Sequence, residues 1–407
     1  MTEQQANAPA TPGTIGLFDN PEFVRNPYGL FKIMRDSSPV VQLGGDVGLW
    51  AVTRYDDVVR VLRDWETFSS RVDARSMRGE ARPPTILFDD PPSHTRMRGL
   101  ISKAFTPRTV ELQRDAIEEN CRRLVDAMLQ HEEADAVAGL AYPLPVMVIA
   151  TMLGVQDGDL ATFKRWSDAI IENLGPTLLT GDDSALLEIN AEFDAYFRAR
   201  LDKLRREPED NLLSELVHAE TEDGRLSEED LLVVCRVLLV AGNETTTGLI
   251  VNAIRAFSDY PEEWDRLREH PELVQSAIEE VLRFYSPFPA TFRRAMRDVE
   301  IGGVRIPKDA RLLPLMASAN RDERAFENPD QFIIDREPNR HLAFGMGIHY
   351  CVGAPLARLE GEIAVRELMR RVRRMKVVHE DGEELMRPGG PKSMMVRFEL
   401  DRAVARV

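Results

Sequence analysis

Apolar residues recur at intervals of three and four along most of the chain, which is the spacing of helices that bury one face. Glycines and prolines, including Gly154, Gly175-Pro176 and Pro208, interrupt this pattern and mark the expected helix ends. From Tyr55 onward the helical pattern dominates. The predicted helices cover residues 27–36, 110–131, 143–153, 160–174, 186–206 and 228–255.

Shorter parts of the chain alternate apolar and polar residues, as strands do. Residues 40–43 and 49–53 predict a β-hairpin, and residues 289–306 are strand-rich with a turn at Gly302-Gly303. Residues 70–84 are polar and aperiodic, which indicates an irregular loop. The sequence therefore predicts a mainly α fold with a smaller β-rich part.

Composition indicates a soluble globular protein, since 43% of the 407 residues are hydrophobic and 29% are charged. No linker or charge block divides residues 14–407, so we expect one domain there. Residues 1–13 read as a disordered tail and not as a signal peptide. The longest apolar stretch, residues 144–155, is too short to span a bilayer, so we expect a cytoplasmic protein without membrane association.

Charge and cysteine content exclude further classes. There are 52 Lys plus Arg against 68 Asp plus Glu, and the formal net charge of -16 repels phosphate backbones, so nucleic acid is not an expected partner. The cysteines, Cys121, Cys235 and Cys351, lie far apart and show no Cys-x-x-Cys spacing. Neither a disulfide framework nor a zinc site is predicted.

Cys351 lies in a glycine-containing stretch directly before the helix-prone residues 354–362. A sulfur at a helix N-terminus is expected to be held as a thiolate by free backbone N–H groups and the helix dipole. Such a thiolate serves as a nucleophile or as an axial ligand to haem iron. The alternative is a buried cysteine that only caps the loop.

The residues around Cys351 favour the ligand. Phe344, Gly347, His349, Cys351 and Gly353 match a pattern that resembles the haem-binding signature of the cytochrome P450 family. The resemblance implies the cytochrome P450 fold and haem b, with Cys351 as the axial ligand of the iron. It also implies that Phe344 and the adjacent Gly345 lie beside the cofactor.

A second motif, residues 241–246, lies inside the longest predicted helix. An acidic residue beside a β-branched threonine, close to a glycine, has low helix propensity and is unfavourable in a helix interior. Such residues inside an otherwise strong helix indicate a functional role. The motif resembles the oxygen-activating helix of the same family. By that resemblance Thr245 and Glu244 are catalytic and handle protons, Ala241 and Gly242 border the haem, and a turn loosened by Gly242 admits dioxygen and water. A helix cap or junction is the structural alternative.

Two further sets of residues follow from the resemblance. His94 and Arg98 are one helical turn apart and able to grip one anion, unless they are a solvated basic face. With Arg293 and His349 they correspond to residues that bind the haem propionates. Glu280, Arg283 and Arg336 correspond to a buried scaffold trio behind the haem.

The implied activity is a haem-thiolate monooxygenase that hydroxylates or O-dealkylates a small hydrophobic substrate. Its electrons are expected from a ferredoxin and an NAD(P)H-dependent ferredoxin reductase, with Arg96, Lys103 and Arg358 as a basic docking patch. Two alternatives stay open. One is a same-fold peroxygenase that uses H2O2, and the other is a non-catalytic haem sensor.

Substrate choice depends first on Arg236, which interrupts an apolar helix and needs an anion. That anion is either a carboxylate on a neighbouring helix or a substrate carboxylate. The second alternative resembles the para-alkoxybenzoate demethylase branch. This sequence differs from that branch at four positions, with Val237 and Val240 in place of serines and Ile171 and Leu174 in place of phenylalanines. The candidate substrate contacts are Arg82, Thr85, Ile171, Leu174, Arg236, Val237, Val240, Ala241, Ala290 and Phe292.

Overall fold

The computed structural model describes residues 25–43, 49–73, 86–180, 182, 184–221, 224–381 and 389–401. The predicted tail at residues 1–13 and most of the predicted loop at residues 70–84 lie outside these ranges.

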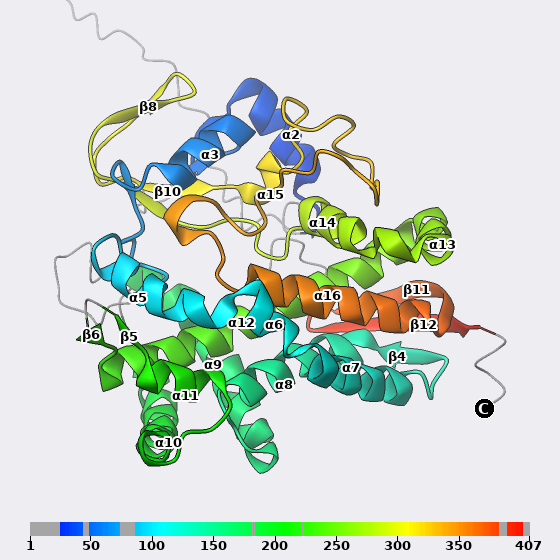
Figure 1. Cartoon of the computed structure of the whole chain (residues 1–407). Helices are drawn as coiled ribbons and strands as arrows, with labels where there is room; N and C mark the ends of the chain where they lie inside the picture. The colour runs from blue at the N-terminus through cyan, green and yellow to red at the C-terminus, as the bar shows by residue number, and fades with distance from the viewer. Residues whose placement is uncertain are drawn as a thin grey trace, which may run out of the picture.

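Helices make up most of the described chain (Figure 1). They are α2 (Tyr28–Ser37), α3 (Tyr55–Arg63), α5 (Ser93–Ile101), α6 (Pro107–Glu111), α7 (Arg114–Met128), α8 (Pro143–Met152), α9 (Leu160–Thr180), α10 (Leu187–Arg206), α11 (Leu212–His218), α12 (Glu228–Asp259), α13 (Pro261–Glu269), α14 (Val274–Phe284), α15 (Met316–Ala319) and α16 (Ala354–Met369). Short helical turns include η2 (Ser102–Phe105), η3 (Val137–Ala141) and η7 (Gly347–His349).

The strands are β1 (Val40–Leu43), β2 (Leu49–Val52), β3 (Phe68–Ser69), β4 (Glu133–Asp135), β5 (Glu220–Thr221), β6 (Gly224–Arg225), β7 (Arg293–Ala295), β8 (Val299–Ile301), β9 (Val304–Ile306), β10 (Arg311–Pro314), β11 (Val372–Asp381) and β12 (Ser393–Leu400). A five-stranded sheet has the order β1-β2-β10-β7-β3, and a three-stranded sheet has the order β11-β12-β4. The predicted hairpin forms, with β1 antiparallel to β2 from Val40↔Val52 to Leu43↔Leu49.

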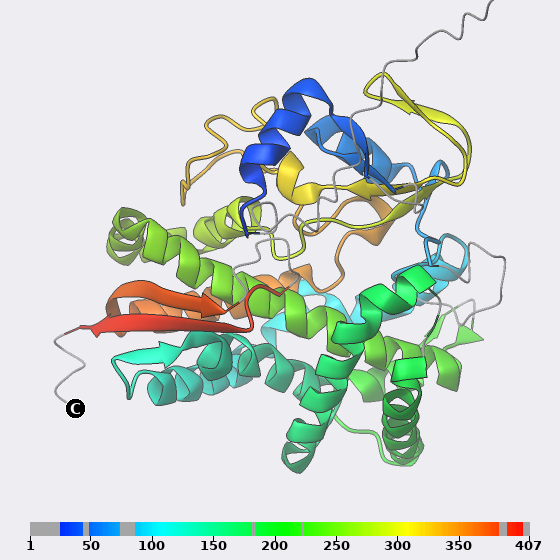
Figure 2. The same cartoon turned by 180° about the vertical axis from the view of Figure 1, so that it is seen from behind.

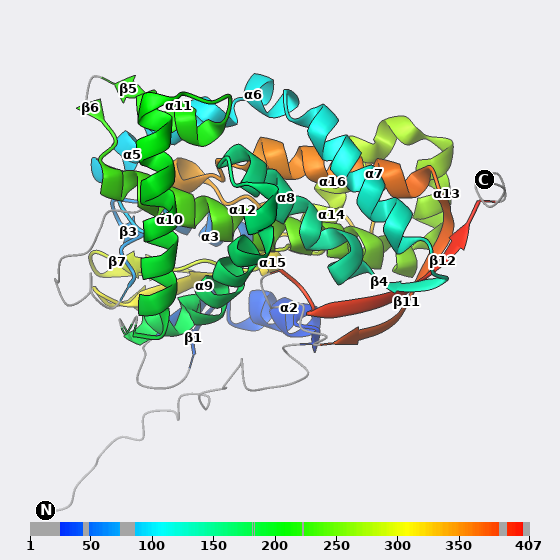
Figure 3. The same ribbon diagram turned by 90° about the horizontal axis from the view of Figure 1, so that it is seen from below.

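α12 and α16 cross the middle of the molecule. Figures 1 and 2 show the five-stranded sheet with α2, α3 and α15 on one side of them and α7 to α11 on the other. Seen from below, α8, α9 and α10 cover α12 (Figure 3), and α12 packs against all three helices as well as against α14 and α16. The largest cluster of buried apolar side chains surrounds α12.

α12 begins with a complete capping box. The Ser227 hydroxyl accepts from the Asp230 N–H, and the Asp230 carboxylate accepts from the Ser227 N–H, each at 3.1 Å. The helix extends one turn beyond its predicted end, to Asp259. Of the described helices, α12 has the length and hydropathy of a membrane span, but 72% of its most apolar window is buried inside the fold, as in a core helix.

Two predicted helix boundaries are wrong. α9 runs through Gly175-Pro176 and ends at Thr180, because a proline disfavours but does not forbid a helical residue before it. The predicted helix at residues 110–131 is divided between α6 and α7, which starts at Arg114. The other predicted elements agree with the structure to within a turn.

Candidate functional site

Backbone geometry fixes Cys351 at the start of α16. The Cys351 N–H donates to the Phe344 carbonyl at 2.9 Å, which closes the turn. Gly347 has a φ of +74°, and a Cβ there would lie 2.7 Å from the Leu62 carbonyl oxygen. This turn therefore requires glycine and presents the sulfur beside the first N–H groups of the helix.

The electrostatics of Cys351 differ from the prediction. Burial raises the pKa of the Cys351 thiol, and this effect outweighs the opposing donors, which are the N–H groups of Gly353 and Ala354 and the guanidinium groups of Arg98 and Arg358. The donors at the helix start therefore do not by themselves favour the thiolate, contrary to the prediction. A metal ion at the sulfur would supply the missing stabilisation, because coordination deprotonates a thiol.

Four cationic or polar side chains from three separate segments gather near this cysteine. His94 and Arg98 lie on α5, Arg293 lies on β7, and the His349 ring lies 4.3 Å from the His94 ring between centroids. The Nε2 atoms of both histidines are buried and have no hydrogen-bond partner in the protein. Two orphaned nitrogens beside two arginines form a site for an anion.

Burial makes these cations unfavourable without an anion. It lowers the pKa of Arg293 to about 10 and that of His349 to about 3. In the described part of the chain, neither Arg98 nor Arg293 has a carboxylate within ion-pair distance, and Arg293 donates to the Phe292 carbonyl at 2.7 Å. The residues therefore fit a buried dianion such as the two propionates of a haem.

On α12, the Thr245 hydroxyl donates to the Ala241 carbonyl at 2.7 Å. Ala241 is exposed although it belongs to the central helix, so this face of α12 is available to a flat prosthetic group. Gly242 serves packing, since a Cβ there would lie 2.7 Å from the Ile149 side chain on α8. α12 is α-helical throughout, so the predicted loosened turn at Gly242 is wrong.

The predicted scaffold residues come together. Glu280 accepts from Arg283 at 2.7 and 2.8 Å and from the Arg336 Nε at 3.0 Å. The Glu280 and Arg283 side chains are fully buried, and Arg336 is 7% exposed. A buried carboxylate shared by two arginines is a rigid support for the segment that leads to Cys351.

Arg236 finds its anion within the protein. Its guanidinium donates to the Asp194 carboxylate on α10 and lies over the Phe193 ring at 5.7 Å. Of the two predicted partners of Arg236, the structure has the carboxylate on a neighbouring helix. A substrate carboxylate is not needed to neutralise Arg236. The other residues of that hypothesis, Arg82 and Thr85, lie outside the described residues.

The apolar substrate candidates occupy different surroundings. Val237 and Val240 are half-buried on α12 and pack against the largest core cluster. Ala290 and Phe292 pack against the smaller cluster around α2 and β10. Ile171 lines a cavity between α8, α9 and α12, whereas Leu174 lies on a part of α9 whose side chains are not described.

Two of the three residues of the predicted basic patch are paired with carboxylates of the protein. Arg96 pairs with Asp230 at 3.0 Å, and Arg358 pairs with Glu279 at 2.7 Å, so both guanidinium groups are neutralised inside the protein. The Lys103 side chain is not described. Each of these arginines pairs with a carboxylate on another helix, and the sequence alone did not identify those carboxylates.

Some functional neighbours were missed from the sequence. Asp194 is one, and a second is the buried pair in which the Asn243 amide donates to the Ser167 hydroxyl at 3.0 Å. Asn243 could have been noticed, because it is a polar residue inside an apolar helix, as Arg236 is. Asp194 carries no comparable signal, since its partner depends on how α10 crosses α12.

Comparisons with known proteins agree with this geometry. The family model described as Cytochrome P450 matches residues 38–396. Cytochrome P450 109 of Bacillus spizizenii is 40% identical over 350 residues, covering 84% of this chain and 84% of that protein. Cytochrome P450 CYP109Q5 from Chondromyces apiculatus has a TM-score of 0.85 at 41% identity, covering 94% of this chain and 97% of that one. CYP109E1 from Bacillus megaterium, solved in complex with testosterone, has a TM-score of 0.81 at 36% identity, covering 91% and 99%.

Proposed function

Because the chain belongs to the cytochrome P450 family and is a monooxygenase that binds haem b, we propose that it oxidises a small, neutral, hydrophobic molecule. We further propose that a ferredoxin, reduced by an NAD(P)H-dependent reductase, supplies the electrons. The observation that carries the substrate class is the Arg236–Asp194 pair, which leaves the Arg236 guanidinium already neutralised. A carboxylate substrate would have to displace Asp194 and leave that carboxylate without its cation.

The chain contributes anchoring and proton handling. Haem b, when bound, supplies the chemistry that cleaves dioxygen and inserts one oxygen atom into a C–H bond. Cys351 would hold the iron, while His94, Arg98, Arg293 and His349 would hold the propionates. Each turnover consumes one O2, two electrons and two protons, and releases one water with the hydroxylated product.

Thr245 and Glu244 are the proposed proton-handling residues. The Thr245 hydroxyl is oriented by its bond to the Ala241 carbonyl, so its oxygen still accepts hydrogen bonds on the Ala241 face of α12. Glu244 is the adjacent carboxylic acid, a type of group that can give up and accept a proton during a reaction. O-dealkylation follows when the oxidised carbon carries an ether oxygen.

Apolar groups form the proposed substrate wall. Val237, Val240 and Phe292 are half-buried and offer no charge. The relative CYP109E1 was solved with testosterone and with corticosterone, which are neutral polycyclic molecules. For this chain we propose neutral hydrophobes of that kind as the first candidates.

An optical titration of the ferric protein tests the substrate class. Aromatic acids and their methyl esters are added in pairs, together with testosterone, and the spin-state shift of the haem is recorded. We expect neutral members to bind at least about tenfold more tightly than the paired acids, since an acid has to be desolvated without a free cation. Tighter binding of the acids, lost in Arg236→Ala, would overturn the proposal.

Turnover with two electron sources tests the redox part. Ferredoxin with its reductase and NADH is compared with H2O2 alone on the same substrate. We expect product with the protein donors to exceed product with peroxide. The reverse result would favour the peroxygenase alternative, and no product with either would favour a haem sensor.

A further inference from the structure

A cavity of about 570 Å³ lies between α8, α9, α12 and the turn before β12. Its wall includes Asn243 and Thr247 of α12, but neither Ala241 nor Thr245. Successive residues of a helix turn by about 100°, so residues two apart point about 200° apart, in nearly opposite directions. The cavity therefore lies behind the face of α12 that carries Ala241 and Thr245.

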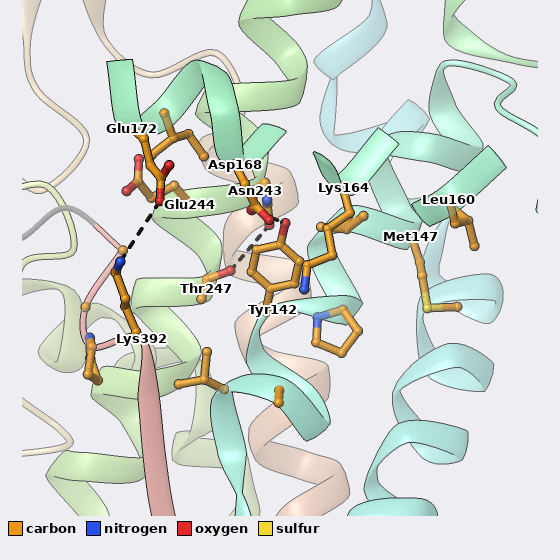
Figure 4. A pocket seen from close by; sticks show the side chains of 18 of the residues that line it. Tyr142, Met147, Leu160, Lys164, Asp168, Glu172, Asn243, Glu244, Thr247 and Lys392 are labelled. Carbon is orange, nitrogen blue, oxygen red and sulfur yellow. Dashed lines mark hydrogen bonds and ion pairs between the residues drawn. The ribbon is translucent and has the colours of Figure 1, made fainter. Parts of the chain in front are cut away.

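Polar side chains from three segments meet at the inner wall of this cavity. The Asn243 amide donates to the Ser167 hydroxyl on α9 at 3.0 Å, and the Thr247 hydroxyl donates to the Asn243 amide oxygen at 3.4 Å. The hydroxyl of Tyr142, which precedes α8, donates to Asp168 at 2.6 Å. Figure 4 shows Tyr142, Asp168 and Asn243 pointing toward one another. Asn243 and Ser167 are both 0% exposed, so a fully buried polar pair joins α12 to α9.

Two glycines bring neighbouring segments close to this part of α12. A Cβ at Gly242 would lie 2.7 Å from the Ile149 side chain on α8. A Cβ at Gly389, in the turn before β12, would lie 2.5 Å from the Glu244 Cγ, and the φ of Gly389 is +79°. These apolar and steric contacts limit distances but have no preferred direction. They do not by themselves define how α12 is rotated about its axis.

The hydrogen bond between Asn243 and Ser167 supplies a direction. Side chains do not interdigitate across a cavity of this size, so close packing does not fix α12 against α9 there. A hydrogen bond weakens steeply away from its preferred angle, and a buried amide without its partner costs the full desolvation of that group. The bond therefore favours the rotation of α12 at which Asn243 faces α9. The same rotation sets where Thr245 points.

We propose that Asn243 is a positioning residue for Thr245, and that it acts through its hydrogen bond to Ser167. The inference rests on the proposed function, in which Thr245 handles protons at the reaction site. Asn243 itself contacts neither haem nor substrate, because it lies on the opposite face of α12. Without the bond we expect Thr245 to be held less well, so that O2, two electrons and two protons leave as H2O2 in place of product and water.

Removing one partner and removing both have different expected results. Asn243→Leu keeps a side chain of similar size but leaves the Ser167 hydroxyl buried without its donor, so the urea midpoint should fall. Asn243→Leu with Ser167→Ala removes both polar partners, which can be nearly neutral for stability, so the midpoint should recover. Product per NADH is measured with the ferredoxin system and the neutral compound that gives the largest spin-state shift. It should be at least about threefold lower in both variants, with the balance as H2O2.

Hydrogen exchange of the haem-loaded protein measures the positioning without turnover. In the peptide that covers residues 241–247, we expect exchange in the double variant to be about tenfold faster, because the helix opens more easily there. Asn252→Leu is the matched control, since Asn252 is another buried amide of α12 and donates to the Tyr285 carbonyl at 2.8 Å. It should lower the urea midpoint but leave exchange of residues 241–247 and product per NADH within about twofold.

Exchanging the two partners tests the bond itself. Asn243→Ser with Ser167→Asn places the amide on α9 and the hydroxyl on α12, and should return product per NADH to within about twofold of the unsubstituted protein.

Two results would overturn the positioning role. One is unchanged exchange of residues 241–247 in the double variant that lacks both partners. The other is normal product per NADH in that variant once its stability has recovered, which would make the pair only structural. The proposed function fails separately, if Thr245→Ala keeps normal product per NADH while exchange still rises in the double variant.

Discussion

The cysteine side and the cavity side of the protein are built by opposite means. At the cysteine, the main chain sets the site, with Gly345 and Gly347 at φ values of +68° and +74° and the Cys351 N–H bonded to a carbonyl. At the cavity, side chains contribute most of the groups, through Glu244 and the Asn243–Ser167 hydrogen bond, while the glycine turn at Gly389 limits the space beside Glu244. The cysteine side therefore depends mainly on backbone conformation, and the cavity side mainly on individual side chains.

The difference predicts separate failures. Changes at the glycines of the turn before Cys351 should lower the free energy of unfolding and haem retention, because residues other than glycine do not fit the positive φ values there. Changes on the cavity side should leave a folded protein with altered proton handling. The following experiments test that division.

The largest effect is expected at Cys351. Cys351→Ser removes the sulfur at the proposed iron position, so we expect loss of product and of the red-shifted Soret band in the reduced, carbon monoxide-treated protein. Cys121→Ala should keep the band. A serine variant that retained it would refute thiolate ligation by Cys351.

The next effect concerns the scaffold behind the cysteine. Glu280→Ala leaves the buried Arg283 guanidinium without its carboxylate and should lower the free energy of unfolding by about 3–5 kcal/mol. Urea unfolding measures the change. Glu262→Ala on α13, an exposed position, should stay within about 0.5 kcal/mol. Equal effects of the two variants would contradict a structural role for the trio.

Gly347→Ala tests the backbone requirement. The positive φ and the contact with the Leu62 carbonyl should cost about 1–3 kcal/mol of stability and reduce haem retention. Gly29→Ala on α2, where nothing lies within 4 Å, should be neutral or stabilising. Unaltered haem content in Gly347→Ala would mean that the turn tolerates other conformations.

Thr245→Ala tests a side chain of α12 that adjoins Glu244 but does not itself line the cavity. Loss of the hydroxyl should reduce product per NADH by about tenfold, with the balance appearing as peroxide, because a positioned proton-handling group is removed. Thr245→Ser, which retains the hydroxyl, is the control. The unfolding midpoint should barely change, and a large drop in stability would place Thr245 with the structural residues instead.

The smallest effect depends on pH. Burial raises the pKa of Glu279, but hydrogen bonds from Arg358 and His341 outweigh it and lower the pKa to about 2 from the ordinary 4.5. The depressed folded-state pKa stabilises the protein above about pH 4.5, and this contribution is lost as the pH falls toward 2. Glu279→Gln should therefore flatten the acid side of the stability profile. An identical stability profile would show that the hydrogen bonds to Glu279 do not contribute to the free energy of unfolding.

Local patterns predicted much of the fold and of the site. The apolar pattern of α12, the glycines around Cys351 and the Glu280–Arg283 spacing are encoded locally, so the sequence identified them. The partner of Arg236 was not predictable, because Asp194 meets it only through the crossing of α10 and α12. The pKa of Cys351 also depends on burial by distant segments, which no local pattern reports.

The contact between Gly389 and Glu244 joins positions that are made at very different times on the ribosome. Residue 244 is translated long before residue 389, so an emerging polypeptide cannot hold the acid in its final setting. A polypeptide that ended before residue 389 would leave α12 without this neighbour. Complete synthesis through β12 is therefore needed to place Glu244 in its final surroundings.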